Sequence, residues 1–150
     1  MTQQRRSVLV TGGSRGIGHA VAKELSKDHH VLVGGTHPDT VNAVVGQLDD
    51  AEPFIADLTD AQAVAEAVAA VDRLDAVVHS AGTYGSGNTL AQTSRSEWRD
   101  VLELNVVAVA DLTAQLLPLL RDSHGQIVMI NSGSGQHRPG PRTGVYAASK

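Results

Sequence analysis

The feature of this sequence that most limits how the chain can fold is a regular alternation of short apolar runs with longer amphipathic segments. The apolar runs are rich in β-branched residues and predict strands at residues 7–11, 30–35, 53–56, 74–80 and 126–131. Between these runs, apolar residues recur at helical spacings. The predicted helices cover residues 16–27, 40–48, 60–71 and 95–120, and another begins at 144–150. Strands that alternate with helices through short connections predict a doubly wound α/β fold with a mostly parallel sheet.

Local patterns add finer expectations about three of these elements. Thr59 and Gln62 form a capping-box pattern at the start of the third helix, and Ser94 and Glu97 form another at the start of the fourth. Residues 126–131 are apolar almost throughout, which is typical of a strand that is covered on both faces.

Composition excludes several classes of protein. The chain has 150 residues, 41% of them apolar, which fits one domain with its own core. Its net charge is −4 and its Lys and Arg residues are dispersed, so a nucleic-acid partner is not expected. Cysteine is absent, so redox chemistry would need a bound cofactor, and the histidines lack metal-ligand spacing, so no metal is expected. Every apolar run is broken well before the length of a membrane span, which predicts a cytoplasmic protein without a membrane partner.

A glycine-rich turn follows the first predicted strand and opens a helix: Thr11-Gly12-Gly13-Ser14-Arg15-Gly16-Ile17-Gly18. A dinucleotide fingerprint requires this context. Gly12 permits a sharp exit from the strand, Gly16 lets the backbone approach a diphosphate, and Gly18 allows close packing of helix and sheet. Free N–H groups and the positive end of the helix dipole would then face the anion. The alternative is that these glycines only make a tight turn.

The spacing Gly-x-x-x-Gly-x-Gly in this turn resembles the short-chain dehydrogenase/reductase family. The longer sugar-nucleotide epimerases usually carry Gly-x-x-Gly-x-x-Gly instead. The resemblance implies that residues 1–150 form a Rossmann-type NAD(P)-binding domain. It also implies an oxidoreductase that transfers a hydride between NADP(H) and a small-molecule ketone or secondary alcohol.

The resemblance further implies which residues meet the cofactor. An acidic residue at the end of the second strand would repel a ribose 2′-phosphate, but the chain has Thr36 and His37 there, with Arg15 nearby. NADP(H) is therefore preferred, with NAD(H) possible. Asp57 lies where the family contacts adenine, although it could instead be a turn residue before Thr59. The expected cofactor-binding residues are Gly12, Ser14, Arg15, Gly16, Ile17, Gly18, Thr36, His37, Asp57, Leu58, Ser80, Ala81, Gly82, Tyr146 and Lys150.

Tyr146 and Lys150 lie one helical turn apart on the same face of the last predicted helix. Taken alone, such a pair is usually a half-buried Tyr beside a solvated Lys. Ser132, however, follows the fifth strand at the edge of the sheet where this fold class binds ligands. The resemblance assigns Tyr146 as proton donor or acceptor and Lys150 as its cationic neighbour. It assigns Ser132 as the hydroxyl that polarises the substrate carbonyl, and Asn105 as a residue that helps to hold a relay water.

Two of these assignments have alternatives. The interval from Ser132 to Tyr146 is one residue longer than is usual in the family, so Ser134 competes for the same role. We prefer Ser132 because it follows the strand without a gap, which places the extra residue in the loop. Asn105 could instead hydrogen-bond the backbone of its own helix.

The sequence departs from the family pattern in two places. Where the family commonly has Asn-Asn-Ala-Gly, the chain has His79, Ser80, Ala81 and Gly82. We interpret His79 as a core residue of a buried strand rather than as a general base or metal ligand. The chain also stops one turn into a helix, whereas family members continue, so we expect it to be truncated. Family members are commonly homodimers or homotetramers. A non-catalytic NADP(H)-binding scaffold is the alternative function.

Overall fold

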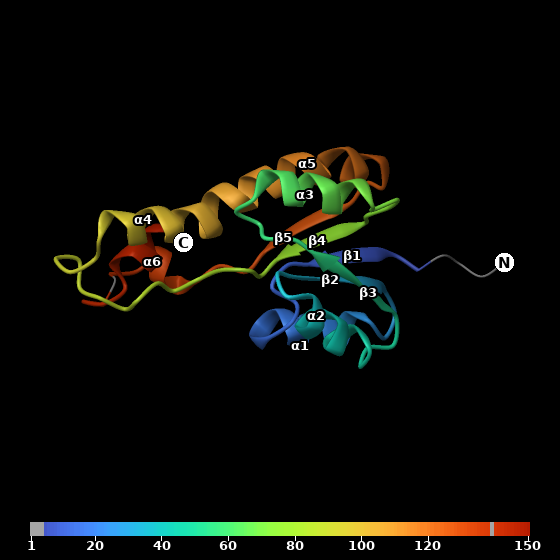
Figure 1. Cartoon of the computed structure of the whole chain (residues 1–150), viewed down its shortest axis with the longest axis horizontal. Helices are drawn as coiled ribbons and strands as arrows, with labels where there is room; N and C mark the ends of the chain where they lie inside the picture. The colour runs from blue at the N-terminus through green and yellow to red at the C-terminus, as the bar shows by residue number, and fades with distance from the viewer. Residues whose placement is uncertain (1–4, 139) are drawn as a thin grey trace.

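The computed structural model describes residues 5–138 and 140–150, which contain one parallel sheet (Figure 1). Its strand order is β3-β2-β1-β4-β5, so the order of the strands reverses between β1 and β4. This is a doubly wound, Rossmann-type α/β fold, as predicted, and such folds bind ligands where the order reverses. The strands are β1 (Ser7–Val10), β2 (His30–Gly35), β3 (Ala51–Ile55), β4 (Ala76–His79) and β5 (Gln126–Met129).

Helices cover both faces of the sheet (Figure 1). The helices α1 (Gly16–Leu25) and α2 (Pro38–Val45) lie on one face, and α3 (Ala61–Ala69) and α5 (Ala108–Asp122) lie on the other. Side chains that alternate along β1, β2 and β4 enter two separate cores. In β1, for example, Val8 and Val10 join the cluster under α1 and α2, whereas Leu9 joins the cluster under α3 and α5.

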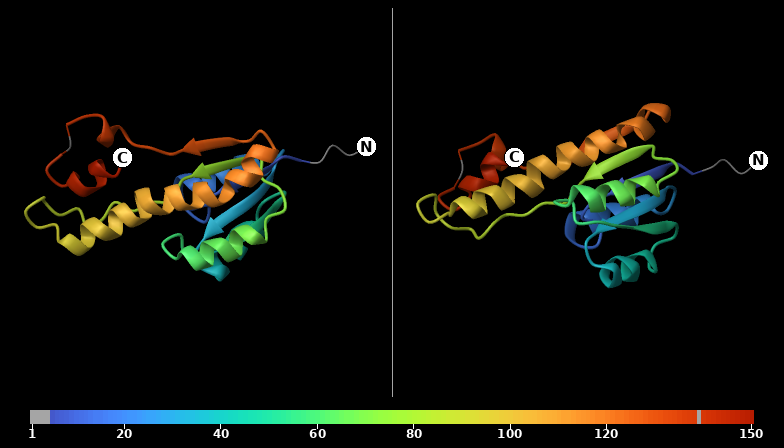
Figure 2. Two further views of the ribbon diagram at one scale, coloured as in Figure 1. Left: turned by 90° about the horizontal axis from the view of Figure 1, so that it is seen from above. Right: turned by 45° about the horizontal axis from the view of Figure 1, so that its top comes forward.

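The predicted long helix is continuous from Arg95 to Asp122 but is not a uniform α-helix. It consists of α4 (Arg95–Leu102), a π-helical turn η1 (Glu103–Val107) and α5. Figure 2 shows that α5 lies along the sheet, whereas α4 extends past it beside α6 (Gly144–Ala148). A π turn holds one more residue than an α turn and often marks a functional site.

The long helix is the one helix of the described residues that is long and apolar enough to cross a membrane by length and composition alone. An 18-residue window of the helix Arg95–Asp122 has a mean hydropathy of 1.4, which is apolar enough by length and composition. A count of unbroken apolar runs does not single out this helix, because polar residues interrupt it, and a buried core helix passes the same test of length and mean hydropathy. The helix has a core role in this structure, because its residues Leu112, Leu116 and Leu120 are buried against the sheet.

The capping box expected at Thr59 and Gln62 is wrong by one residue. Asp60 caps α3, and its carboxylate accepts hydrogen bonds from the N–H groups of Gln62 (3.0 Å) and Ala63 (3.2 Å). Ser94 caps α4 as predicted, by accepting from the N–H of Glu97 (3.1 Å). Adjacent polar residues such as Thr59 and Asp60 can both cap a helix, so sequence alone leaves the choice open.

The last strand, β5, is exposed rather than covered on both faces as expected. It lies at the edge of the sheet and pairs with β4. Ile127 and Val128 are each 42% exposed and Met129 is 59% exposed. In the described part of the chain, the apolar side chains of β5 are therefore left uncovered. The segment after it contains a short 3-10 helix, η2 (Gly133–Gly135).

Candidate functional site

A cavity of about 1010 Å³ opens at the carboxyl ends of the strands. Every residue that the sequence analysis expects to contact the cofactor lines this cavity, from the glycine turn after β1 to Tyr146 and Lys150 of the last segment. Other lining residues, which no sequence motif had indicated, include Thr83, Tyr84, Asp100, Leu104, Ile130 and Asn131. Ile130 and Asn131 could have been found from their position after a parallel strand, which is where such folds bind ligands.

The glycine turn has the geometry of a close backbone approach. Gly12 has a φ of +61°, and a Cβ on it would lie 2.9 Å from the Cα of Ala81. A Cβ on Gly18 would overlap the carbonyl oxygen of Gly12. Gly16 also has a positive φ, +58°, but no atom lies within 4 Å of the place where its Cβ would be. Gly12 and Gly18 are therefore needed for packing within the protein, whereas Gly16 leaves open space.

The start of α1 presents free N–H groups to the cavity. Its N-cap residue, Arg15, makes no side-chain capping hydrogen bond, and the residues that follow it, Gly16, Ile17 and Gly18, line the cavity. The first N–H groups of a helix lack partners within the helix and lie at the positive end of its dipole. This end of the cavity therefore suits an anion such as a phosphate.

Thr11 is a structural residue of the site that the sequence analysis did not single out. Its side chain is buried, and its hydroxyl oxygen accepts hydrogen bonds from the N–H groups of Ser80 (3.0 Å) and Ala81 (3.1 Å). Thr11 also donates to the carbonyl oxygen of Val78 (3.5 Å). These bonds fix the segment after β4 against the end of β1, which places Ala81 over the glycine turn.

The opposite side of the cavity, at the end of β2, carries exposed polar side chains. Thr36 and His37 lie there, and they line the cavity together with Arg15, the exposed N-cap residue of α1. Asp57 lines the cavity too, and it also has the turn contacts of the alternative interpretation. Its carboxylate accepts from the N–H (2.9 Å) and the hydroxyl (2.7 Å) of Thr59, and the backbone bond, followed by the side-chain bond, lowers the pKa of Asp57.

Tyr146 and Lys150 lie close together at one end of the cavity. The Nζ atom of Lys150 is 5.6 Å from the centre of the Tyr146 ring and donates to the carbonyl oxygen of Ile130 at 3.5 Å. Gly82 passes beside this pair, because a Cβ on it would lie 3.7 Å from the Nζ of Lys150 and 3.1 Å from the Oδ1 of Asn105. The chain thus brings Gly82, Asn105 and Lys150 together from three distant parts of the sequence.

Asn105 is buried in the π turn, and the structure rejects the alternative that it bonds to its own helix. Its Oδ1 accepts from the N–H of Thr83 (2.8 Å), and its Nδ2 donates to the carbonyl oxygen of Thr83 (2.8 Å) and to the hydroxyl of Ser149 (2.8 Å). Ser149 in turn donates to the carbonyl oxygen of Tyr146 (2.7 Å). Asn105 therefore joins the loop after β4 to the segment that carries Tyr146. The sequence analysis missed Ser149.

Ser132 is not among the described residues that line the cavity, and neither is its competitor Ser134. The hydroxyl oxygen of Ser132 accepts from the N–H of Ser134 (3.2 Å) and caps the short helix η2. Its two predecessors, Ile130 and Asn131, do line the cavity. The structure thus places Ser132 next to the cavity but does not bring its hydroxyl to Tyr146.

His79 is a core residue, as predicted. Its side chain is buried, and burial lowers its pKa. The hydroxyl of Thr113 donates to the carbonyl oxygen of Val109 (2.6 Å), so it accepts from the Nε2 of His79 (2.9 Å). The hydrogen therefore lies on Nε2, and Nδ1 is a buried nitrogen with no partner among the described residues. A neutral histidine with this tautomer suits the core.

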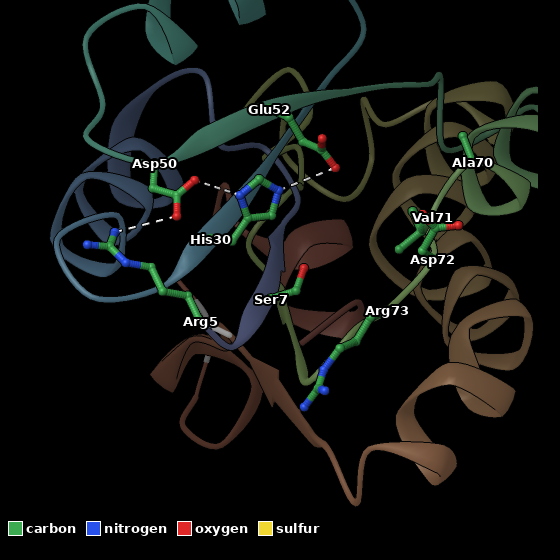
Figure 3. A pocket seen from close by; sticks show the side chains of 9 residues that line it. All are labelled: Arg5, Ser7, His30, Asp50, Glu52, Ala70, Val71, Asp72 and Arg73. Carbon is green, nitrogen blue, oxygen red and sulfur yellow. Dashed lines mark hydrogen bonds and ion pairs between the residues drawn. The ribbon is translucent and has the colours of Figure 1, made fainter. Parts of the chain in front are cut away.

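A second hollow of about 420 Å³ lies at the amino ends of the strands, away from the glycine turn (Figure 3). His30 stands between two carboxylates there, with its Nδ1 2.8 Å from Asp50 and its Nε2 3.5 Å from Glu52. Partial burial lowers the pKa of His30, but the hydrogen bonds with Asp50 and Glu52 outweigh it and raise the pKa overall. Among the described residues, no group of His, Asp or Glu has the arrangement of a metal site.

Comparisons with known proteins agree with one another on the family of this chain. The family model described as short chain dehydrogenase matches residues 6–150. The oxidoreductase YciK of Escherichia coli is 32% identical over 97% of this chain and 62% of its own length. A rhamnolipid-biosynthesis 3-oxoacyl-(acyl-carrier-protein) reductase of Pseudomonas aeruginosa is 33% identical over 97% of this chain and 61% of its own length. This chain therefore spans about three fifths of the length of these curated relatives.

Solved structures also resemble the fold of this chain. The crystal structure of a short-chain dehydrogenase of Shigella flexneri, solved in complex with NADP, has a TM-score of 0.90 and 31% identity. The similarity covers 98% of this chain and 66% of that protein.

Proposed function

The chain belongs to the short-chain dehydrogenase family, and from that membership we propose that it carries the cofactor site and the reacting side chains of an NADP(H)-dependent oxidoreductase. Its substrates are ketones and secondary alcohols. One observation carries the proposal: Tyr146 and Lys150 line the same cavity as the glycine turn at residues 12–18. A phenol that can move a proton and a turn that can hold a diphosphate then serve one reaction.

The residues of the cavity fit a nicotinamide dinucleotide. The diphosphate would lie on the N–H groups of Gly16, Ile17 and Gly18, where the missing Cβ of Gly16 leaves open space. A cavity of about 1010 Å³ lies at the upper end of the range for small-molecule sites. Asp57 and Leu58 would hold the adenine, and Ser80, Ala81 and Gly82 would lie along the nicotinamide end.

A ribose 2′-phosphate is supported by the charges at the end of β2. Arg15 lines the cavity beside Thr36 and His37, and the strand β2 ends in Gly34 and Gly35 rather than in a carboxylate. A cation near the 2′ position favours the phosphate of NADP(H), whereas an acidic residue there would favour NAD(H). The related Shigella flexneri dehydrogenase was solved with NADP.

The side chain of Tyr146 moves the proton of the reaction. When bound, the nicotinamide supplies or removes the hydride at the carbon of the substrate carbonyl. Tyr146 gives its phenolic proton to the carbonyl oxygen in reduction and takes it back from the alcohol in oxidation. The ammonium of Lys150, 5.6 Å from the ring centre, stabilises the negative charge that develops on the phenol oxygen as the proton leaves.

Ser132 and Asn105 support this step. The hydroxyl oxygen of Ser132 accepts a hydrogen bond from Ser134, so its own hydrogen stays free to be donated to a substrate carbonyl once Ser132 turns toward the cavity. Asn105 holds the loop at Thr83 and the segment at Ser149 together, which keeps Tyr146 in place beside that loop. Substrate hydroxyl or carbonyl groups then meet a preorganised set of polar groups.

The domain assignment, the cytoplasmic location and the homo-oligomeric state stay predictions. We propose that residues 1–150 act as one NAD(P)-binding domain, which the single parallel sheet with its two cores supports. A small-molecule partner is typical of this family.

Tyr146→Phe in the natural protein tests the proposal, because it removes the proton and keeps the ring. NADPH oxidation with a panel of ketones should fall by about 10²- to 10⁴-fold, the usual contribution of a general acid. The Kd for NADPH, measured by fluorescence titration, should change by no more than about twofold, since a phenylalanine ring still fits the site. Unchanged turnover in Tyr146→Phe would refute the role of the phenol. NADPH binding without turnover of any ketone or alcohol by the unmodified protein would favour the non-catalytic scaffold.

A further inference from the structure

Tyr84 is a lining residue of the cavity that the proposed chemistry does not use. It lies in the loop between β4 and α4, and its side chain is 46% exposed. Its ring centre is 4.8 Å from that of Tyr146, with an angle of 37° between the two planes. The aromatic ring of Tyr84 therefore stands directly beside the phenol that would meet a substrate carbonyl.

The loop around Tyr84 is anchored on both sides by the long helix. On one side, Thr83 exchanges two hydrogen bonds with Asn105, each of 2.8 Å. On the other side, the carboxylate of Glu97 accepts from the hydroxyl (2.6 Å) and the N–H (2.8 Å) of Ser86. These bonds with Ser86, the hydroxyl first, also lower the pKa of Glu97. The N–H of Glu97 thus makes its expected bond to Ser94, whereas its carboxylate, which would complete the capping box, holds the loop instead.

This anchoring matters because an exposed aromatic ring in a loose loop would lose conformational freedom on binding a ligand. Gly85 follows Tyr84 with a φ of +82°, and a Cβ on it would lie 2.9 Å from the Oε1 of Glu97. The backbone on both sides of Tyr84 is thus already fixed. A ring held in this way can bind a flat group at little further entropic cost.

We propose that Tyr84 forms an aromatic wall of the substrate site and selects carbonyl compounds that carry a flat aromatic or conjugated group next to the carbonyl. This inference rests on the proposed function. A carbonyl oxygen that accepts the proton of Tyr146 has its substituents within reach of the neighbouring ring, and flat groups stack on aromatic faces. The corresponding aryl or conjugated secondary alcohols are the substrates of the reverse reaction.

The other side chains around Tyr84 favour an uncharged substrate. Leu104 and Ile130 are apolar lining residues at this end of the cavity. Of the charged side chains that line the cavity among the described residues, Lys150 lies beside Tyr146, and Asp100 belongs to α4, which contacts the helix α6 that carries Tyr146. The proposed reaction already uses Lys150, and Asp100 would repel an anion. A carboxylate or phosphate beside the carbonyl would therefore find no free counter-ion, whereas a neutral aryl ketone needs none.

Two ketones of equal size and different flatness test this inference in the natural protein with NADPH. Acetophenone and cyclohexyl methyl ketone have the same number of heavy atoms, but only acetophenone has an aromatic ring. The unmodified protein should favour acetophenone by about tenfold in kcat/KM, and Tyr84→Phe, the matched control, should keep that preference. In Tyr84→Leu the ratio should approach one, mainly through the KM for acetophenone, while the Kd for NADPH stays the same.

The outcomes separate the inference from the function on which it rests. Retention of the full preference in Tyr84→Leu, or a preference of the unmodified protein for the cyclohexyl ketone, would overturn the role of Tyr84 and leave the oxidoreductase function intact. Failure of the unmodified protein to turn over any ketone or alcohol would overturn both. If Tyr84→Leu lowered kcat for both ketones and left both KM values unchanged, Tyr84 would be a residue that positions Tyr146. That result would also overturn the proposed substrate class.

Discussion

Replacing Gly12 with alanine should destabilise the protein far more than the same change at Gly16. Both glycines have positive φ angles, +61° and +58°, so alanine costs about 1–2 kcal/mol at either position. Only at Gly12 does the new Cβ meet backbone, at 2.9 Å from the Cα and 3.0 Å from the N of Ala81. That backbone cannot move freely, because Ala81 and Ser80 both donate to the hydroxyl of Thr11. An overpacked contact of this kind costs about 1–3 kcal/mol more.

Gly12→Ala should therefore lower the free energy of unfolding by about 2–5 kcal/mol, and Gly16→Ala by about 1–2 kcal/mol. The entropy that alanine removes from the unfolded chain is the same for both variants and cancels in the comparison. Equilibrium urea unfolding, followed by circular dichroism of the natural protein, measures both values. Equal losses in the two variants, or a larger loss at Gly16, would refute the argument from close approach. The Kd for NADPH should rise clearly in Gly16→Ala, because its Cβ enters the space proposed for the diphosphate.

Arg15→Ala should weaken the binding of NADPH about tenfold more than that of NADH, because it removes a charge-assisted contact with the 2′-phosphate; equal losses of affinity for both cofactors in fluorescence titrations would contradict this. His30→Gln should make stability less dependent on pH. Because the fold raises the pKa of His30, its ion pairs with Asp50 and Glu52 stabilise the protein fully below the unfolded value of 6.5 and are lost as pH rises through the folded-state pKa. The unfolding midpoints of unmodified protein and variant should therefore converge as pH rises above 6.5, and a gap that widens with pH would contradict the assignment.

The presence of five strands and the doubly wound fold follow from local pattern and were predicted from the sequence. Alternating side chains such as Val8 and Leu9 enter different cores, so the period of the sequence reflects burial directly. The exposure of β5 could not be predicted in this way, because it depends on which other segments pack over its two faces. The cap of α3 depended on a choice between the neighbours Thr59 and Asp60, which both have capping side chains.

The candidate site was predictable where a motif supplies it, and less so where residues meet only in three dimensions. The glycine turn and the pair Tyr146 and Lys150 are short motifs with fixed spacing, and they do line one cavity. Tyr84 and Ser149 have no such spacing, because they reach the site through Asn105 and the packing of the long helix. The hydroxyl of Ser132 caps a short helix, a local alternative that sequence reasoning did not weigh.

The π turn at Glu103–Val107 gives up regular α-helical hydrogen bonding and places Asn105 between two other segments. Deleting one residue there would restore regular α-helical bonding and leave α4 and α5 in phase, since the wide turn absorbs that extra residue. The regular helix would be more stable, but Asn105 would no longer be placed to hydrogen-bond both Thr83 and Ser149. The segment that carries Tyr146 would then lose its link to the loop at Thr83.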